Sequence, residues 1–176
     1  LPQTYDLIPG TMRRHAKGFG FVAPDSGGED LFVPRTEMRY AINGDRVLVR
    51  MMQERHGDHR VGIVERVVSH TVTHVSGVFF PSGGRGYVLA DDKRMEDILI
   101  PAGKTMNAEK GDKVRVKITG YPSERSGMKG EIAEIYGRAG DSRAEAAAIL
   151  GRFDIRTEFP EDVLKEAEQI GQRLES

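Results

Sequence analysis

The residues best suited to chemistry lie near the start of the chain, where aromatic rings alternate with glycines. The segment 17–22 reads Lys-Gly-Phe-Gly-Phe-Val, and in an extended strand Phe19 and Phe21 project from the same face. The glycines beside them leave both rings accessible to a ligand. Nucleobases stack on such rings at about 1–3 kcal/mol per base. We therefore predict that Phe19 and Phe21 bind single-stranded nucleic acid, with Lys17 placed for a phosphate.

A third ring follows in the apolar segment 31–33, where Phe32 could extend the same surface. The alternative is that these phenylalanines are ordinary core residues, because Phe is commonly buried. The flanking lysine and glycines favour stacking over core packing. An RRM also carries such an aromatic strand, but it needs a helix between its two aromatic strands, and this sequence leaves no room for one.

An internal repeat organises most of the chain. The repeat predicts two copies of one unit, at residues 10–74 and 75–137. Three groups of residues recur at a spacing of 67 positions: Gly10 and Gly77, residues 30–34 and 97–101, and residues 44–47 and 111–114.

Each copy has the composition of a short-stranded β domain. Apolar runs of three or four residues are separated by turn residues, and Gly44 and Gly111 mark tight turns because glycine accepts positive φ. Residues 54–60 read as a polar link between two strands. About five strands in some 65 residues is the size of an OB-type barrel. The predicted fold class is mainly β, with two tandem five-stranded barrels.

The second copy has fewer aromatic residues. Tyr87 and the neighbouring Arg85 correspond to the aromatic strand of the first copy, and residues 98–100 contain no aromatic residue. We predict that Arg85 and Tyr87 contact RNA, with a purely structural barrel and a solvated charged rim as an equal alternative.

Residues 138–176 differ from both copies. Residues 141–150 are rich in alanine and predict a helix, and apolar residues at helical spacing between 163 and 170 predict another. Such a tail cannot form a core alone. It is either a cap on the second barrel or the start of a further domain.

Composition limits the remaining possibilities. The net charge is −1, with +2 over residues 1–137 and −3 beyond, so binding driven by phosphate contacts alone is disfavoured. The absence of cysteine excludes disulfides and thiolate metal sites, and fits a reducing cytoplasm. No apolar run is long enough for a membrane span. His56 and His59 lie in the polar link, and we interpret them as solvated residues and predict no metal site.

The first copy resembles a cold-shock domain. Residues 17–22 are similar to the first RNA-binding motif of that family and residues 31–33 to its second, which implies RNA contacts by Lys17, Phe19, Phe21 and Phe32. The sequence departs from the family at Pro34, where a histidine is usual, and Arg35 stands where an aromatic residue is usual. We include Arg35 among the predicted RNA-binding residues.

The order of the whole chain resembles the ribonuclease R group of the RNase II family, on two cold-shock-like copies followed by segments 130–137 and 155–160. The resemblance implies a hydrolytic, magnesium-dependent 3′–5′ exoribonuclease whose catalytic domain would begin at residues 138–176. No clustered aspartates occur here, so we expect the chain itself to be inactive. We expect single-stranded RNA as the partner, with neither a membrane nor a small-molecule substrate. The alternatives are a stand-alone RNA-binding or RNA-chaperone protein and a structural barrel pair that contacts protein.

Overall fold

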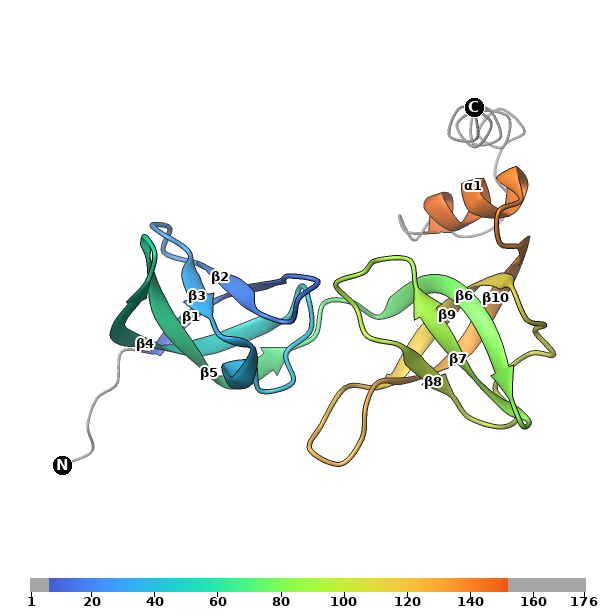
Figure 1. Cartoon of the computed structure of the whole chain (residues 1–176), viewed down its shortest axis with the longest axis horizontal. Coiled ribbons are helices and arrows are strands. Elements are labelled where there is room, and N and C mark those ends of the chain that lie inside the picture. Colours follow the sequence, from blue (N-terminus) through green and yellow to red (C-terminus); the bar gives the residue numbers. More distant parts are fainter. Residues whose placement is uncertain (1–6, 152–176) are drawn as a thin grey trace. The chain divides into compact units, whose positions relative to one another are not determined.

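Two closed five-stranded barrels make up most of the structure, a computed structural model that describes residues 7–151. They belong to two compact units of the chain, and Figure 1 labels their strands. The first barrel contains β1 (Leu7–Arg14), β2 (Gly20–Pro24), β3 (Leu31–Val33), the 3-10 helix η1 (Arg35–Glu37), β4 (Arg46–His56) and β5 (His59–Ser69). The second contains β6 (His74–Ser82), β7 (Arg85–Ala90), β8 (Ile98–Ile100), β9 (Asp112–Gly120) and β10 (Lys129–Arg138), followed by helix α1 (Ser142–Gly151).

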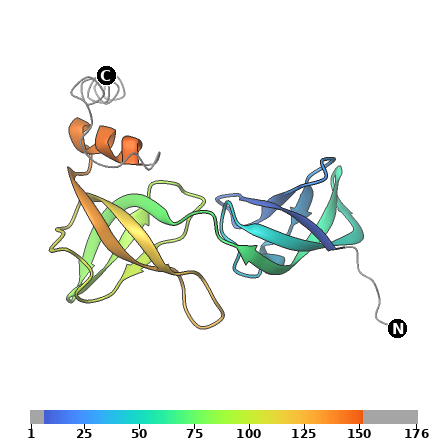
Figure 2. The same cartoon turned by 180° about the vertical axis from the view of Figure 1, so that it is seen from behind.

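Both barrels have the same strand order. The first runs β1-β2-β3-β5-β4 and closes on itself, and the second runs β6-β7-β8-β10-β9. Figure 2 shows the strands of both barrels from behind. Neighbouring strands are antiparallel except for one short parallel pair in each barrel, β3 with β5 and β8 with β10. This is the arrangement of an OB-fold. The predicted fold class, two tandem barrels and then a short helix, is confirmed.

The core of the first barrel follows from alternation along its strands. The strands β2 and β3 bury Val22, Leu31 and Val33. Phe21 and Phe32, which alternate with these residues, are only half-buried and face outward. Since successive residues of a strand point to opposite faces, aliphatic residues fill the barrel and the phenylalanines coat its outside. The buried core cluster comprises Met12, Val22, Leu31, Val33, Met38, Ala41, Val47, Val49 and Val64.

One close approach inside the barrel occurs twice. A Cβ placed at Gly20 would lie 2.6 Å from the sulfur of Met12, and one at Gly86 would lie 2.3 Å from the ring of Phe79. Met12 and Phe79 are fully buried at corresponding positions of β1 and β6. Only glycine leaves room for these large side chains beside the neighbouring strand.

The predicted tight turns also recur. Gly44 and Gly111 have φ values of 90° and 88°, a region that favours glycine. The next residue in each copy, Asp45 or Asp112, accepts a hydrogen bond through its carboxylate from the backbone N–H three residues earlier, at 2.8 Å in both. This bond ties the loop to the start of β4 or β9.

The partner of each aspartate differs between the barrels. In the first, the Nδ1 atom of His70 lies 2.8 Å from Asp45, and in the second Arg138 lies 3.3 Å from Asp112. Asp45 is fully buried. Burial raises the pKa of Asp45, and the hydrogen bonds from Ile42 and His70 offset part of that rise.

Helix α1 packs on the second barrel. Asp141 caps it by accepting from the N–H of Arg143 at 2.9 Å. The helix buries Ala144, Ala146 and Ala148. The ammonium of Lys113, itself 6% exposed, lies 3.0 Å from Glu145 of α1 and also pairs with Asp91. Residues 142–151 thus cap this barrel.

The helix predicted near residues 163–170 lies outside the described residues. Within residues 7–151, no helix is long and apolar enough to cross a membrane.

Candidate nucleic-acid interface

The predicted stacking residues form one aromatic surface on the outside of the first barrel. Phe21 and Phe32 are direct partners across β2 and β3, and their ring centroids are 5.6 Å apart. The ring of Phe19 lies 6.0 Å from Phe21 and 5.6 Å from Phe32. All three are half-buried, and none belongs to the barrel core. The prediction that Phe19 and Phe21 share a face is confirmed, and packing in the barrel core is ruled out.

Three histidine rings join this surface. His15 stacks on Phe19 with centroids 4.4 Å apart, and His56 stacks on Phe32 at 3.9 Å. His59 meets Phe21 edge-on at 5.1 Å. We call these six rings the aromatic platform: His15, Phe19, Phe21, Phe32, His56 and His59.

The prediction that residues 54–60 form a polar link between two strands is wrong. Because of that error, the predicted RNA-binding residues did not include His56 and His59. Strand β4 continues to His56 and β5 starts at His59, so only Gly57 and Asp58 form the turn. Two residues of the Gly-Asp type between two strand-like runs are a hairpin signal. That signal is present in the sequence and predicts that the two histidines face each other across the hairpin, as they do.

Basic side chains border the platform. Lys17 is exposed in the turn between β1 and β2, and Arg35 is exposed at the start of η1. The aliphatic part of Arg35 lies over Gly18, where an added Cβ would be 2.9 Å from its Cδ. Arg13, which the sequence reading did not single out, is the exposed cross-strand partner of Phe21. Alternation along β1 could have found it, because Met12 beside it is buried.

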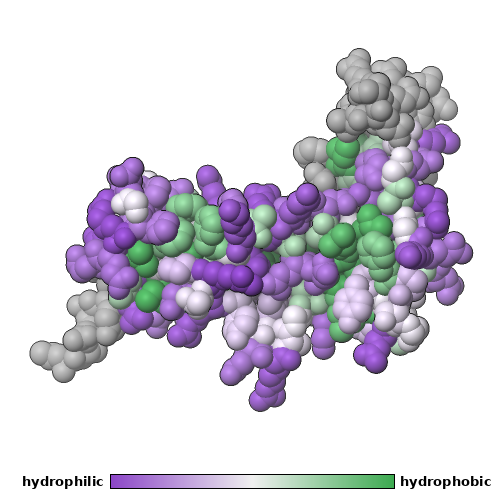
Figure 3. Space-filling view, in the orientation of Figure 1, coloured by the Kyte–Doolittle hydropathy of each residue, from purple (hydrophilic) through white to green (hydrophobic). Residues whose placement is uncertain are grey.

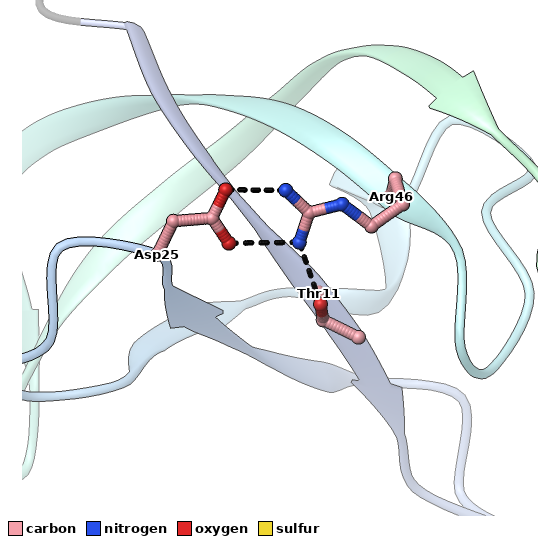
Figure 4. A network of polar contacts seen from close by, with 3 residues as sticks. All are labelled: Thr11, Asp25 and Arg46. Carbon is pink, nitrogen blue, oxygen red and sulfur yellow. Dashed lines mark hydrogen bonds and ion pairs between the residues drawn. The ribbon is translucent and has the colours of Figure 1, made fainter.

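Arg46, by contrast with these basic residues, is held in an ion pair within the first barrel. The guanidinium of Arg46 binds both carboxylate oxygens of Asp25 and donates to the hydroxyl of Thr11 at 2.8 Å (Figure 4). The hydrogen bond from Arg46 lowers the pKa of Asp25. This contact joins the turn after β2 to β1 and β4, so Arg46 supports the barrel and we do not assign it to the RNA surface.

The outer face of the second barrel carries a smaller aromatic group. Tyr87 is 47% exposed and lies directly opposite Phe80, which is 39% exposed. Arg85 is exposed at the start of β7. Hydrophobic patches interrupt the mostly hydrophilic surface of the described residues in Figure 3.

Phe80 is a residue that the sequence reading missed. Val75, Gly77 and Phe79 are buried at alternate positions of β6, which places Phe80 on the outer face. Leu99 of β8 is the cross-strand partner of Tyr87 on its other side. It occupies the position that Phe32 has in the first barrel. The second barrel therefore offers two neighbouring aromatic rings where the first offers six.

No cluster of acidic and imidazole groups suggests metal chemistry in the described part of the chain. Among residues 7–151 there is no group of three or more His, Asp or Glu side chains that could hold a metal ion. The platform histidines contact phenylalanines, as described above.

Comparison with known families assigns each barrel separately. Residues 10–67 match the family described as the ribonuclease B OB domain. Residues 87–160 match the family described as the cold shock domain. The cold-shock likeness is thus found for the second copy, where the aromatic motif is weaker, and the first copy matches an OB domain of a ribonuclease family.

Curated relatives named ribonuclease R match nearly the whole chain. The protein from Vibrio parahaemolyticus is 30% identical over 178 residues, which cover 99% of this chain and 21% of that protein. This chain is homologous to part of ribonuclease R. It spans between 17% and 39% of the length of three such ribonuclease R relatives.

Solved structures show the same fold. Ribonuclease R of Mycoplasma genitalium, solved in complex with ribose-methylated single-stranded RNA, has a TM-score of 0.73 at 18% identity, covering 88% of this chain and 25% of that one. The yeast protein Ssd1, described as a pseudonuclease, has a TM-score of 0.68 at 17% identity over 82% of this chain and 24% of its own. Similar folds therefore occur in a ribonuclease R and in a pseudonuclease.

Proposed function

We propose that this chain is the single-stranded RNA-binding region of a ribonuclease R-like 3′–5′ exoribonuclease and that it guides RNA to a catalytic domain outside the chain. The observation that carries the proposal is the aromatic platform, held outside the core of the first barrel and bordered by basic residues. Stacking on ring faces tolerates any base, as a degradative enzyme requires. The homology to ribonuclease R supplies the enzyme context.

The residues assigned to RNA in this proposal belong to both barrels. The catalytic step and its magnesium ions belong to the rest of the parent protein, which we place in the cytoplasm, and the chain alone is expected to be inactive. The proposed RNA-binding residues are Lys17, Phe19, Phe21, Phe32 and Arg35 in the first barrel and Arg85 and Tyr87 in the second.

The domain limits are part of the same proposal. Residues 10–74 and 75–137 are the two RNA-binding barrels, and residues 138–176 open the catalytic domain. Helix α1, which packs on the second barrel, would be the first element of that opening segment.

The experiment is a titration of labelled single-stranded RNA of about a dozen nucleotides, followed by anisotropy at low and moderate salt. Binding should weaken with salt and drop strongly in the Phe19→Ala, Phe21→Ala double variant. Val68→Ala is the control, since Val68 is 54% exposed on β5 and takes no part in the six-ring platform. Unchanged affinity in a folded double variant would refute the proposal.

A stand-alone RNA-binding protein without nuclease activity is the second candidate, and the similar fold of a pseudonuclease is the observation that favours it. The complete coding sequence separates the two. A catalytic domain with clustered aspartates after residue 176 supports the nuclease, and a stop codon there supports the stand-alone protein.

A further inference from the structure

Two phenylalanines of the platform are already stacked against imidazole rings. The planes of His15 and Phe19 are 9° from parallel, and those of His56 and Phe32 are 12° from parallel. One face of each phenylalanine is therefore occupied within the protein. Both histidines are exposed, so on those faces the imidazole is the outer layer.

The fold fixes His15 in this position. Its backbone N–H donates to the carbonyl of Phe19 at 2.8 Å, and the N–H of Gly18 donates to the carbonyl of His15 at 2.9 Å. The N–H of Lys17 donates to the Nδ1 atom of the ring at 3.1 Å. Because Nδ1 accepts this bond, the ring hydrogen is on Nε2, which can donate to an acceptor on a ligand.

The hairpin of β4 and β5 holds the other histidines. His56 and His59 are cross-strand partners beside the turn. The Nδ1 atom of His59 lies 3.0 Å from the carbonyl oxygen of Asp30, which can only accept, so Nδ1 carries the hydrogen. This bond ties the hairpin to the residue before β3 and keeps His56 over Phe32.

We propose that His15 and His56 are base-stacking residues of the RNA-binding surface, each supported from beneath by a phenylalanine. The proposal rests on the proposed function, and it names two residues that bases touch directly. A nucleobase stacks on any aromatic face, and an imidazole held parallel to a phenylalanine presents such a face with its orientation already set. The binding unit is thus a three-layer stack of phenylalanine, imidazole and base.

If the histidines instead shield the phenylalanines from RNA, their removal should change RNA affinity in the opposite direction. If the imidazoles only cover the phenylalanines, RNA must displace them before it stacks, and their removal would increase affinity. If they are stacking residues, their removal decreases affinity. The sign of the change therefore decides between the two roles.

The test compares single-stranded RNA affinity across variants of the full 176-residue chain. His15→Ala and His56→Ala should each weaken binding about tenfold, within the range for loss of one stacking ring. His15→Phe and His56→Phe should restore binding to within about twofold of the original protein, because a phenyl ring also stacks. His74→Ala, which removes a histidine of β6 outside the platform, is the control and should leave affinity unchanged.

Three results would overturn the proposal. Unchanged or tighter binding in both alanine variants, with weaker binding in the Phe19→Ala, Phe21→Ala variant, would overturn it and leave the proposed function standing. Weaker binding that phenylalanine fails to restore would show that the imidazoles act through hydrogen bonds or charge instead of stacking. Full affinity in the Phe19→Ala, Phe21→Ala double variant would overturn both this proposal and the proposed function. Thermal melting of each variant verifies that it is folded.

Discussion

The two barrels agree where the fold needs particular residues and differ where a ligand would bind. Both keep the glycine beside a large core residue, Gly20 or Gly86, and both keep the Gly-Asp turn before the fourth strand. On the outer face, the first barrel presents six aromatic rings, whereas the second presents Phe80 and Tyr87 with Leu99 beside them. The difference shows that the requirements of the barrel and those of its outer surface rest on separate residues.

The largest expected effect concerns the boundary between core and surface in β6. Phe79 is fully buried and Phe80 is 39% exposed. Phe79→Ala should lower the free energy of unfolding of the second barrel by about 3–5 kcal/mol, whereas Phe80→Ala should cost about 1 kcal/mol or less. Denaturant unfolding of both variants measures this. Similar losses of stability in the two variants would contradict the placement of Phe79 in the core and Phe80 on the outer surface.

A smaller effect is expected at the repeated glycines. Gly20→Ala and Gly86→Ala should each destabilise their own barrel by about 1–3 kcal/mol, because a new methyl group overlaps a core side chain. The loss should be greater at Gly86, since the ring of Phe79 is stiffer than the flexible side chain of Met12. Thermal melting measures both losses, with Gly127→Ala as a control in open space. Equal stability of Gly86→Ala and the original chain would contradict the shared packing.

The next prediction compares the two outer faces as RNA-binding surfaces. Phe21→Ala should weaken single-stranded RNA binding by roughly 1–3 kcal/mol, the range for one lost stacking ring. Tyr87→Ala should weaken it less, because Tyr87 has one aromatic neighbour on its strand pair instead of a platform. Anisotropy titrations at one salt concentration compare them. A larger loss for Tyr87→Ala would place the main RNA-binding surface on the second barrel.

The smallest effect is a pH dependence of the first barrel. Because burial raises the pKa of Asp45, its stabilising contribution is full below the ordinary value of 3.8 and is lost as pH rises through the folded value. Asp45→Asn should therefore gain stability relative to the original chain as pH increases above about 4. Melting temperatures of both proteins between pH 3.5 and 7 provide the measurement.

Asp25 supplies a control of opposite sign. Arg46 lowers the pKa of Asp25, so its contribution is present above 3.8 and is lost as pH falls through the folded value. Asp25→Asn should thus be less stable than the original chain at neutral pH, and this difference in stability should shrink as pH falls. Parallel pH trends for the two variants would contradict the assigned causes.

Much of this architecture can be predicted from the sequence, because the repeat exposes it. A spacing of 67 residues aligns the turn glycines and the apolar strands, and the alternation in residues 17–22 indicates an outward aromatic face. Phe19 and Phe21 followed from that alternation together with the flanking lysine and glycines, and Phe32 followed from its place in the next predicted strand. These features are local, so short-range patterns carry them.

The missed residues depend on contacts between distant segments. His56 and His59 reach the platform only through a hairpin whose strands are polar near the turn, and a polar strand end looks like a loop in composition. Their ring partners, Phe32 and Phe21, lie more than twenty residues earlier. Phe80 was missed for a different reason: it follows another phenylalanine, and only the burial of Phe79 shows which of the two faces outward.

RNA binding to the aromatic platform of the first barrel is the central proposal for this chain. The most direct measurement is an amide chemical-shift map of the 176-residue chain during titration with a short single-stranded RNA. We expect the largest shifts to cluster at residues 15–21, 31–33 and 56–59, with smaller shifts on β7. Shifts confined to the second barrel, or none at saturating RNA and low salt, would contradict it.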